Sequence, residues 1–308
     1  MVGTKQLFMP TLIVIAGPTA SGKTSLAIKL AQHFSTQILS ADSRQFYKGL
    51  DIGTAKPSSS ELALIDHHFI DSHNITDDYN ISDYEQDALK ILESIFTKVN
   101  VAILTGGSGL YIRAVCSGID EQPGRNDSIR KDLINIYESK GLEELRIKLK
   151  SLDPVYYNSV DLANPHRLIR ALEVCLTTGK KFSDFRKNVP VPRPFNILKI
   201  GLLLSREVLY ERIDKRVDQM ITQGLVQEAQ RLFPYRHVNA LNTVGYKELF
   251  NFIDGKTTLE EAIDLIKQNT RNYAKRQMTW FRKEQGIKWF DPEDYSGILN
   301  YIESKLSA

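Results

Sequence analysis

A glycine-rich octapeptide near the N-terminus constrains this chain more than any other feature. It follows a short apolar run at 12–16 and precedes an amphipathic segment containing Leu26, Ala27 and Leu30. The octapeptide has the pattern G-x-x-x-x-G-K-T and consists of Gly17, Pro18, Thr19, Ala20, Ser21, Gly22, Lys23 and Thr24. Between a buried strand and a helix, such a loop turns its backbone N–H groups toward a phosphate, and the helix N-terminus adds positive potential. The motif predicts a loop that binds a diphosphate or a triphosphate, with Lys23 as a mobile charge and the Thr24 hydroxyl in a Mg²⁺ shell.

Strand and helix patterns alternate through the first third of the chain. Apolar runs at 12–16, 37–40 and 101–104 have the length of buried parallel strands, and 82–97 has helical periodicity. This order predicts a doubly wound α/β fold with a parallel sheet, as in P-loop nucleotide-binding proteins. Between about 118 and 190 only helical patterns occur, and an apolar strand pattern resumes at 197–204. We therefore expect a catalytic core at 1–118 and 193–308, with an all-helical insertion at 119–192.

Composition adds few constraints. The chain has 308 residues, of which 42% are apolar, and a net charge of +3, so the charge distribution carries more information than its sum. No segment approaches the roughly 20 apolar residues of a membrane span. Cys116 and Cys175 lie in apolar helical patterns, and no Cys/His cluster has zinc spacing. We expect a cytoplasmic protein with buried thiols that is active as a monomer and is not bound to a membrane.

The phosphate motif alone leaves the reaction open. Kinases, nucleotide hydrolases that bind ATP, and transferases that release diphosphate all need such a loop. Asp42 follows the second strand, where it fits either a metal ligand or a general base. The strand at 101–104 runs into Thr105 and two glycines, where typical P-loop hydrolases have a carboxylate. The insertion also lacks the dense arginine cluster of a nucleotide-kinase lid. Both observations argue against phosphoryl transfer.

The C-terminal region carries a basic helical pattern. Seven basic residues and one acid, Glu284, lie between positions 267 and 288, and Lys267, Arg271 and Lys275 recur every four residues. Arg276 and Trp280 are interleaved with them. Cations mixed with aromatic rings are typical of surfaces that bind a phosphate backbone and stack on bases. A solvated charged face with aromatics in the core is the alternative. His166, Arg167 and Arg170 form a second basic group in the insertion.

Seven segments in order along the chain resemble bacterial tRNA dimethylallyltransferases. The DIGTAKP string is the most specific of them, and the full set is GPTASGKT at 17–24, ADSRQFY at 41–47, DIGTAKP at 51–57, GGSGLY at 106–111, NPHRLIRALE at 164–173, VGYKE at 244–248 and TRNYAKRQMTWFR at 270–282. The resemblance implies a P-loop core, dimethylallyl diphosphate as donor, and the exocyclic N6 amine of the adenosine 3′-adjacent to the anticodon of tRNA as acceptor.

The resemblance also implies roles for individual residues. Asp42 is expected to be the base, Ser108 to lie near the reacting carbon, and Lys23 with Mg²⁺ to stabilise the leaving diphosphate. The expected tRNA contacts are Asp42, Ser43, Arg44, Gln45, Ser108, Arg130, His166, Arg167, Leu168, Ile169, Arg170, Lys275, Arg276, Gln277 and Trp280. Some relatives have a diphosphate-binding arginine where this chain has Asn242, so either Lys247 or Arg271 is expected to supply the charge or the diphosphate is held more weakly.

Two other classes of function remain open at this level. One is a small-molecule enzyme, either an isopentenyltransferase for free adenine nucleotides or a nucleotide kinase. The other is a P-loop protein that binds RNA or switches by hydrolysing ATP. In a small-molecule enzyme, the insertion and the basic C-terminal pattern would need another purpose.

Overall fold

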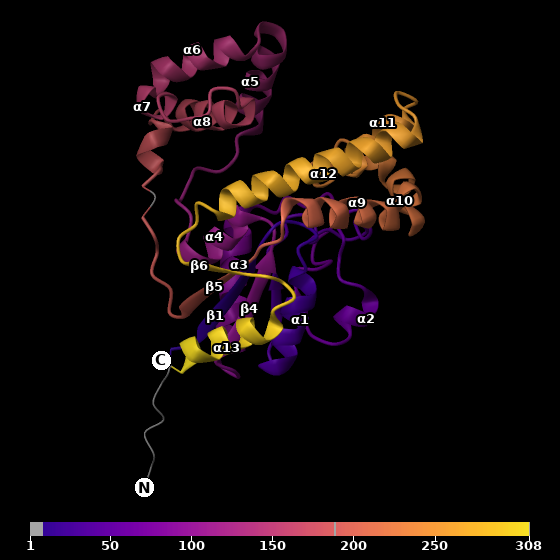
Figure 1. Ribbon diagram of the computed structural model, residues 1–308. Helices are drawn as coiled ribbons and strands as arrows, with labels where there is room; N and C mark the ends of the chain where they lie inside the picture. Colours follow the sequence, from indigo (N-terminus) through magenta and orange to yellow (C-terminus); the bar gives the residue numbers. More distant parts are fainter. Residues whose placement is uncertain (1–8, 188, 308) are drawn as a thin grey trace. The chain divides into compact units, whose positions relative to one another are not determined.

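The computed structural model describes residues 9–187 and 189–307, and its core is a six-stranded sheet. All neighbouring strands are parallel, in the order β3-β2-β4-β1-β5-β6 (Figure 1). The strands are β1 (Thr11–Ala16), β2 (Ile38–Ser40), β3 (His67–His68), β4 (Val101–Gly106), β5 (Asn196–Leu202) and β6 (Ile287–Phe290). The doubly wound α/β prediction is confirmed.

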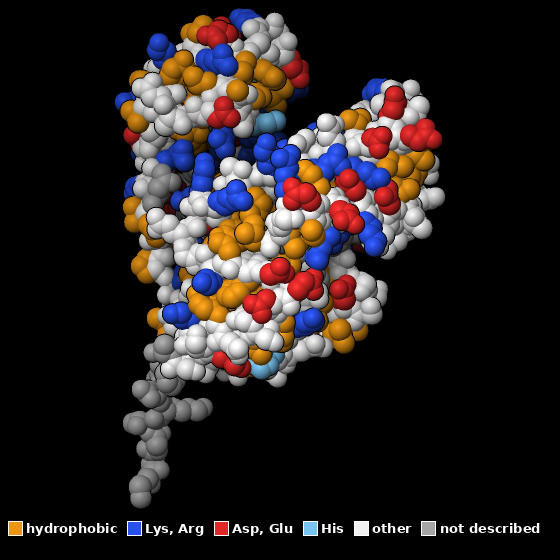
Figure 2. Space-filling view, viewed as in Figure 1, with side chains coloured by type: hydrophobic (Ala, Val, Ile, Leu, Met, Phe, Trp, Pro, Cys, Tyr) orange, Lys and Arg blue, Asp and Glu red, His pale blue; other side chains and the backbone are white. Residues whose placement is uncertain are grey.

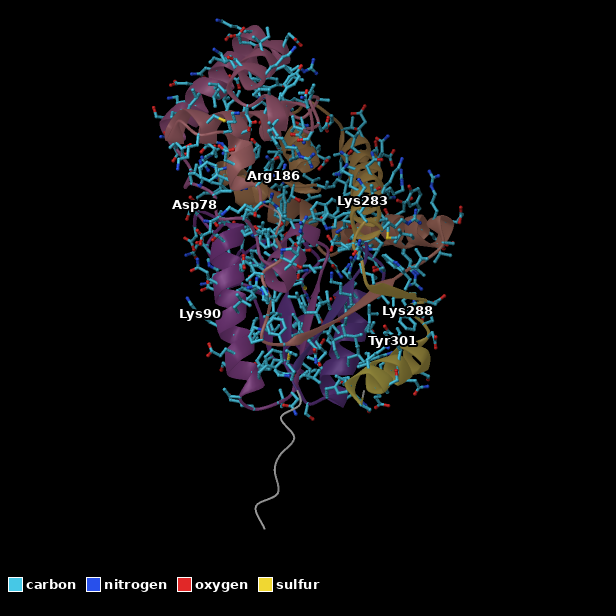
Figure 3. The ribbon with its side chains drawn as sticks, turned by 90° about the vertical axis from the view of Figure 1, so that its left-hand side faces the viewer. Asp78, Lys90, Arg186, Lys283, Lys288 and Tyr301 are labelled. Carbon is cyan, nitrogen blue, oxygen red and sulfur yellow. The ribbon has the colours of Figure 1, made fainter. Side chains whose placement is uncertain are left out.

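Helices cover both faces of the sheet, which explains why β1 is buried at every position and apolar from Leu12 to Ala16. Leu12 and Val14 belong to one hydrophobic cluster, whereas Ile13 and Ile15 belong to another. The first cluster includes residues of α3 (Ile81–Phe96) and α4 (Gly109–Ser117). The second includes residues of α1 (Lys23–His33) and α13 (Tyr295–Leu306). In Figure 3 the sheet lies between α3, which carries Lys90, and α13, which carries Tyr301.

A group of C-terminal helices packs above the carboxyl ends of the strands (Figure 1). The longest, α12 (Leu259–Phe281), packs against α9 (Arg206–Thr222) and α11 (Tyr246–Ile253). A capping box starts α12, because Thr258 Oγ1 accepts from Glu261 N and Glu261 Oε2 accepts from Thr258 N. The same group contains α10 (Leu225–Leu232) and the 3₁₀ turns Phe233–Tyr235 and Asn239–Leu241. The short α2 (Ser59–Leu62) lies between β2 and β3 in the chain.

The chain divides into two compact units, 1–117 with 192–308 and 118–191. These limits lie one residue from the expected ones. The second unit contains α5 (Asp127–Lys140), α6 (Leu142–Leu152), α7 (Pro154–Tyr157), α8 (Pro165–Thr178) and a 3₁₀ turn at Phe182–Phe185. Its own core includes Leu133, Leu145, Leu149 and Leu172. No strand occurs in its described residues, as the sequence predicts.

Arg193 anchors the chain where it re-enters the first unit. Its guanidinium donates to the carbonyls of Ala114 (2.7 Å) and Val115 (2.9 Å) in α4 and pairs with Glu85 (2.5 Å). The side chain is buried, and the two carbonyls belong to the last turn of α4, just before the chain leaves the unit. The chain therefore leaves and re-enters the first unit beside a single ion-paired arginine.

Both cysteines are free and buried, as expected. Burial raises the pKa of the Cys116 thiol to about 12, so this side chain behaves as a small apolar group. Across the described ranges, no helix combines the length and apolar character needed to cross a bilayer. The same ranges contain no group of three or more His, Cys, Asp or Glu side chains arranged to hold a metal ion.

Candidate active site

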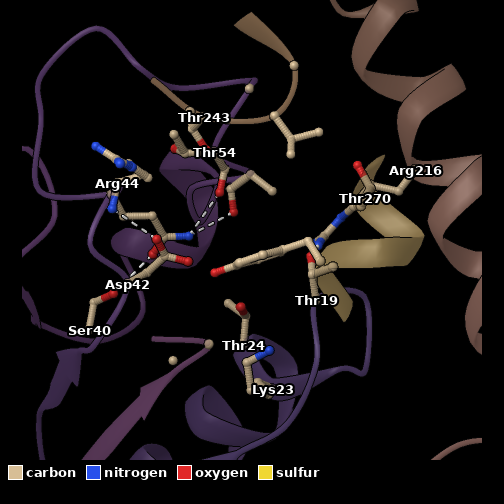
Figure 4. A pocket seen from close by; sticks show the side chains of 18 of the residues that line it. Thr19, Lys23, Thr24, Ser40, Asp42, Arg44, Thr54, Arg216, Thr243 and Thr270 are labelled. Atoms are coloured by element: carbon tan, nitrogen blue, oxygen red, sulfur yellow. Dashed lines mark hydrogen bonds between the residues drawn. The ribbon is translucent and has the colours of Figure 1, made fainter. Parts of the chain in front are cut away.

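A cavity lies at the carboxyl ends of β1, β2 and β4, where the strand order reverses direction around β1. Its walls come from the phosphate-motif loop, the segments after β2 and β4, and one face each of α9 and α12. In the view of Figure 4, Asp42 lies on one side, Arg216 and Thr19 lie on the other, and Lys23 and Thr24 lie below and between them. The structure thus brings together the phosphate loop and Asp42.

The loop at 17–22 has the backbone conformation its glycines predict. Gly22 has φ +92°, a left-handed conformation that a side chain would strain, and α1 begins at the next residue. Lys23 Nζ donates to the carbonyl of Pro18 at 2.6 Å, so this side chain links the two ends of the loop. Gly106 is needed for a different reason, because a Cβ there would collide with the backbone of Ala41. The loop after β2 and the end of β4 can therefore approach closely.

Two cations share the phosphate side of the cavity. Burial, followed by the nearby charge of Arg216, lowers the pKa of Lys23 to about 7. Burial also lowers the pKa of Arg216, whose Nη1 lies 3.3 Å from Thr19 Oγ1. Two half-buried cations close together repel each other, and a bound polyanion would relieve that repulsion. A pair of cations beside a phosphate-loop motif is an arrangement suited to phosphate oxygens.

Asp42 is the acid of the cavity, and its surroundings make it a stronger base than an ordinary aspartate. Burial raises its pKa, although the backbone N–H of Arg44 donates to Oδ1 at 3.0 Å and the Lys23 charge opposes the shift. Lys23 and Asp42 interact electrostatically across the cavity. A carboxylate with a raised pKa, aimed into a pocket opposite a phosphate site, is suited to accept a proton.

Ser108 and Ser43 form a polar contact beside Asp42. Ser108 Oγ accepts from the backbone N–H of Ser43 (3.1 Å) and lies 3.3 Å from the Ser43 hydroxyl. The phenol of Tyr273, on α12, interacts with Ser108, and burial raises the pKa of Tyr273 to about 12. Tyr273 therefore stays protonated. It lines the cavity with a hydroxyl group that can form hydrogen bonds.

Arg44 and Gln45, expected to contact tRNA, make contacts within the protein. The Arg44 guanidinium donates to the carbonyls of Asn239 (2.8 Å) and Ala240 (3.3 Å). Gln45 Nε2 donates to the carbonyls of Thr54 and Ala55, each at 3.2 Å, and Gln45 Oε1 accepts from the Ser40 hydroxyl. Both side chains fix the turn that carries Asp42.

The structure also corrects the expectation for Gln277. This side chain is only 5% exposed, its Oε1 accepts from the Thr19 backbone N–H at 2.9 Å, and its Nε2 donates to the Gly107 carbonyl at 3.0 Å. It ties the phosphate loop to the turn after β4, and it also lines the cavity. Trp280 packs on the core against Gly109, so most of its ring is also unavailable.

The basic residues of α12 divide into two groups. Lys267 pairs with Asp218 (2.6 Å) and Arg271 with Asp214 (2.5 Å), both acids of α9. Figure 2 shows acidic and basic side chains intermingled over these two helices. Neither Arg271 nor Lys247 lines the cavity, nor does Asn242; Arg216 brings a charge there instead. The expectation that Arg271 binds the diphosphate is therefore not supported by its position.

The basic group of the insertion is divided as well. Arg130 and Arg170 both pair with Glu173, which is buried, at 2.9 and 3.2 Å. Leu168 and Ile169 lie in the core of the insertion, where their side chains are buried. His166 and Arg167 are exposed in the first turn of α8. Only these two project freely from the predicted block.

Sequence reasoning missed several residues that build the site. Arg216 lies in the middle of a charged helix, and only the packing of α9 shows that it faces the cavity. The α12 side chains Ile266, Thr270, Tyr273 and Gln277 also line it. Their spacing of three and four residues places them on one helical face, a signal that the sequence contains.

Comparisons with known proteins agree along almost the whole chain. A family model described as IPP transferase matches residues 45–284. A tRNA dimethylallyltransferase of Christiangramia forsetii is 54% identical, covering 96% of this chain and 99% of its own length. A tRNA dimethylallyltransferase 1 of Bacteroides thetaiotaomicron is 50% identical, with 96% of each chain covered.

Solved structures give the same result. The full-length tRNA isopentenylpyrophosphate transferase of Bacillus halodurans superposes with a TM-score of 0.72 at 36% identity, with 97% of each chain covered. A eukaryotic dimethylallyltransferase described as acting on tRNA has a TM-score of 0.75 at 29% identity, covering 93% of this chain and 75% of its own. With this fold, this cavity and these relatives, the chain belongs to the IPP transferase family.

Proposed function

We propose that this protein transfers a dimethylallyl group from dimethylallyl diphosphate to the N6 amine of the adenosine 3′-adjacent to the anticodon in tRNA, with release of diphosphate. The observation that carries the proposal is one cavity with a phosphate loop and two cations on one side and a basic carboxylate on the other. The names of the relatives support the same reaction.

The leaving group is held at the phosphate side. Backbone N–H groups of the loop, Lys23 and Arg216 surround the position of the diphosphate. Their attraction to the diphosphate grows as the bond between the prenyl C1 and the bridging oxygen breaks, because both electrons of that bond go to the diphosphate. Transition-state charge is thus stabilised more than ground-state charge.

The residues present fit a magnesium ion held mainly by the substrate. Thr24 and Asp42 line the cavity, and the described chain offers no group of three acidic or imidazole ligands. Mg²⁺ usually takes one or two protein oxygens together with phosphate oxygens and water. The Thr24 hydroxyl would hold the ion, which supplies further positive charge to the diphosphate oxygens.

An apolar wall lies next to Arg216 and suits the five-carbon group. Val217 and Met220 follow Arg216 on α9, and Leu225 and Ile266 complete the surface. These side chains exclude water from a carbon that gains allylic cation character. The prenyl group would therefore lie between the phosphate loop and this wall.

The acceptor amine attacks from the side of Asp42. The N6 lone pair forms the new bond to C1, and the N6 proton passes to a carboxylate oxygen of Asp42. An adenine amine is a poor nucleophile, so alignment within a dry cavity and a base of raised pKa both favour the attack. The adenosine must leave its stack to enter, which costs less in a loop than in a duplex.

Exposed cations supply the expected RNA surface. In the core these are Lys275 and Arg276 on α12, and in the insertion they are His166 and Arg167. Each is a candidate for a phosphate contact.

Two free buried thiols are consistent with a reducing, cytoplasmic location, and we propose that the enzyme acts there as a monomer.

Radiolabelled dimethylallyl diphosphate offered to tRNA, to free AMP and ATP, and to buffer tests the proposal. Label is expected in tRNA alone and, after nuclease digestion, in the adenosine that follows the anticodon. A tRNA with guanosine at that position is the matched control and should take up none. Label in free nucleotides, or ATP hydrolysis without prenyl transfer, would contradict the proposal.

A further inference from the structure

A buried glutamate outside the cavity gathers the segment that forms one of its walls. Glu228, on α10, is 1% exposed. Its Oε2 accepts from the backbone N–H groups of Asp51 (3.1 Å) and Ile52 (2.9 Å), and its Oε1 accepts from Gly53 N–H (2.9 Å) and the phenol of Tyr246 (2.7 Å). Four donors thus converge on one carboxylate. Such charge-assisted contacts in a buried place are strong and directional.

The geometry around Gly53 shows how closely this segment is held. A Cβ on Gly53 would fall 2.6 Å from the ring of Tyr246, so only glycine allows the phenol to reach Glu228. The next residues, Thr54 and Ala55, line the cavity. Glu228 itself does not line it, so any effect it has on the reaction must pass through the segment it holds.

The side chain of Gln45 connects the segment to the turn that carries Asp42. The carbonyls of Thr54 and Ala55 both accept from Gln45 Nε2, and the backbone N–H of Gln45 donates to the Asp42 carbonyl at 3.2 Å. The same turn provides the Arg44 N–H that donates to the Asp42 carboxylate. An unbroken series of hydrogen bonds therefore runs from Glu228 through the 51–55 backbone and Gln45 to the turn of Asp42.

We infer that Glu228 is a positioning residue for Asp42, acting through the 51–55 backbone and Gln45. The inference rests on the proposed prenyl transfer, in which Asp42 receives the N6 proton. A glutamine at 228 would replace one acceptor oxygen by an NH₂ donor that faces N–H donors. At least one of the three backbone contacts would be lost, and the 51–55 wall would shift away from Gln45.

The test compares Glu228→Gln, Asp42→Ala and the double variant. Loss of alignment is expected to lower kcat of Glu228→Gln by about 10- to 100-fold, with the Kd for tRNA within about twofold of wild type. In the Asp42→Ala background the same substitution should change the residual rate by less than about threefold, because the two residues act through one group. Equal losses in both backgrounds would overturn the inference. Glu211→Gln, an exposed position on α9, is the matched control and should keep full activity.

Two further measurements separate this inference from its alternatives. Backbone amide exchange at residues 51–53 should accelerate in Glu228→Gln, and unchanged exchange would contradict the anchoring role. If Glu228→Gln does not fold, Gln45→Ala breaks the middle of the series and leaves the buried carboxylate paired. The loss of kcat caused by Gln45→Ala should likewise nearly disappear in the Asp42→Ala background. A loss of the same size in both backgrounds would overturn the inference. Failure of wild-type protein to prenylate tRNA would instead reject the proposed function.

Discussion

The four cations of α12 fall into two halves, Lys267 with Arg271 and Lys275 with Arg276, and the two are used differently. In the first half, Lys267 and Arg271 are paired with acids of α9. In the second half, Lys275 and Arg276 are exposed, and no carboxylate of the described residues lies within ion-pair distance of either. Lys283, just beyond the helix, is likewise exposed (Figure 3). Regular spacing alone does not identify a binding surface, since the residues across from each cation decide its use.

A third face of the same helix belongs to the cavity. Thr270, Tyr273 and Gln277 point toward the phosphate loop and Asp42. One helix thus contributes internal ion pairs, cavity walls and exposed cations. Groups facing the cavity are expected to govern the rate or donor binding, whereas the exposed cations should govern only RNA affinity. The following predictions test that division.

The largest effect is expected at Asp42. Replacing Asp42 with alanine removes the proton acceptor, so kcat should fall by about 10²- to 10⁴-fold. The Kd for tRNA should change by less than about twofold, because few RNA contacts are lost. Single-turnover kinetics and a tRNA binding titration measure the two quantities. Equal losses in rate and affinity would exclude the role as a base.

Arg216 is expected to have the next largest effect. Arg216→Ala removes a buried cation from the diphosphate side, and a charge-assisted contact of about 1.5–3 kcal/mol corresponds to a rise in donor KM of about 10- to 100-fold. Affinity for tRNA should be retained. Arg212→Ala is the control, because Arg212 lies one turn earlier on α9 and pairs with Glu293. An unchanged donor KM for Arg216→Ala would place the diphosphate elsewhere.

The depressed pKa of Lys23 predicts a pH effect on donor binding. Lys23 in the free enzyme has a pKa of about 7, whereas a bound diphosphate stabilises the charged form. As pH rises through about 7, the free enzyme loses this proton, and donor KM should rise by up to about tenfold per pH unit. Donor KM measured between about pH 6 and pH 9 tests this. Lys23→Met should bind donor weakly without that slope, and a flat wild-type profile would refute the assignment.

The smallest effects are expected at the exposed cations, and they test the division of α12 directly. Lys275→Ala and Arg276→Ala should each weaken tRNA binding and reduce the slope of log Kd against log salt by about 1, with kcat unchanged. Lys267→Ala, on the paired half, should leave the slope unchanged. Equal changes for Lys267 and Lys275 would break the distinction between the two halves.

Much of the fold can be predicted from local patterns. The phosphate loop, the buried strands β1 and β4 and the bounds of α8 and α9 follow from apolar runs, glycines and caps. Two strands are not predicted. β3 has only two residues, and β6 has four, so neither offers a pattern long enough to recognise. They join the sheet because neighbouring edges offer backbone hydrogen bonds.

The site is less predictable than the fold because its polar groups are satisfied by distant parts of the chain. Gln277 bonds to Thr19 and Gly107, and Glu228 bonds to Asp51, so neither role can be inferred from nearby sequence. A motif shows which residues occur together, but it does not show which face inward. Gln45 and Gln277 were therefore expected at the RNA surface, although both hold the cavity together.

The arginine that follows the insertion has a consequence for how such a protein can diversify. Arg193 bonds to the end of α4, so the outgoing and returning chains are fixed side by side on the sheet unit. Residues 118–191 can lengthen, shorten or be exchanged without altering strand register or the phosphate loop. Selection can thus reshape the appended helices while the chemistry of the sheet unit is inherited unchanged.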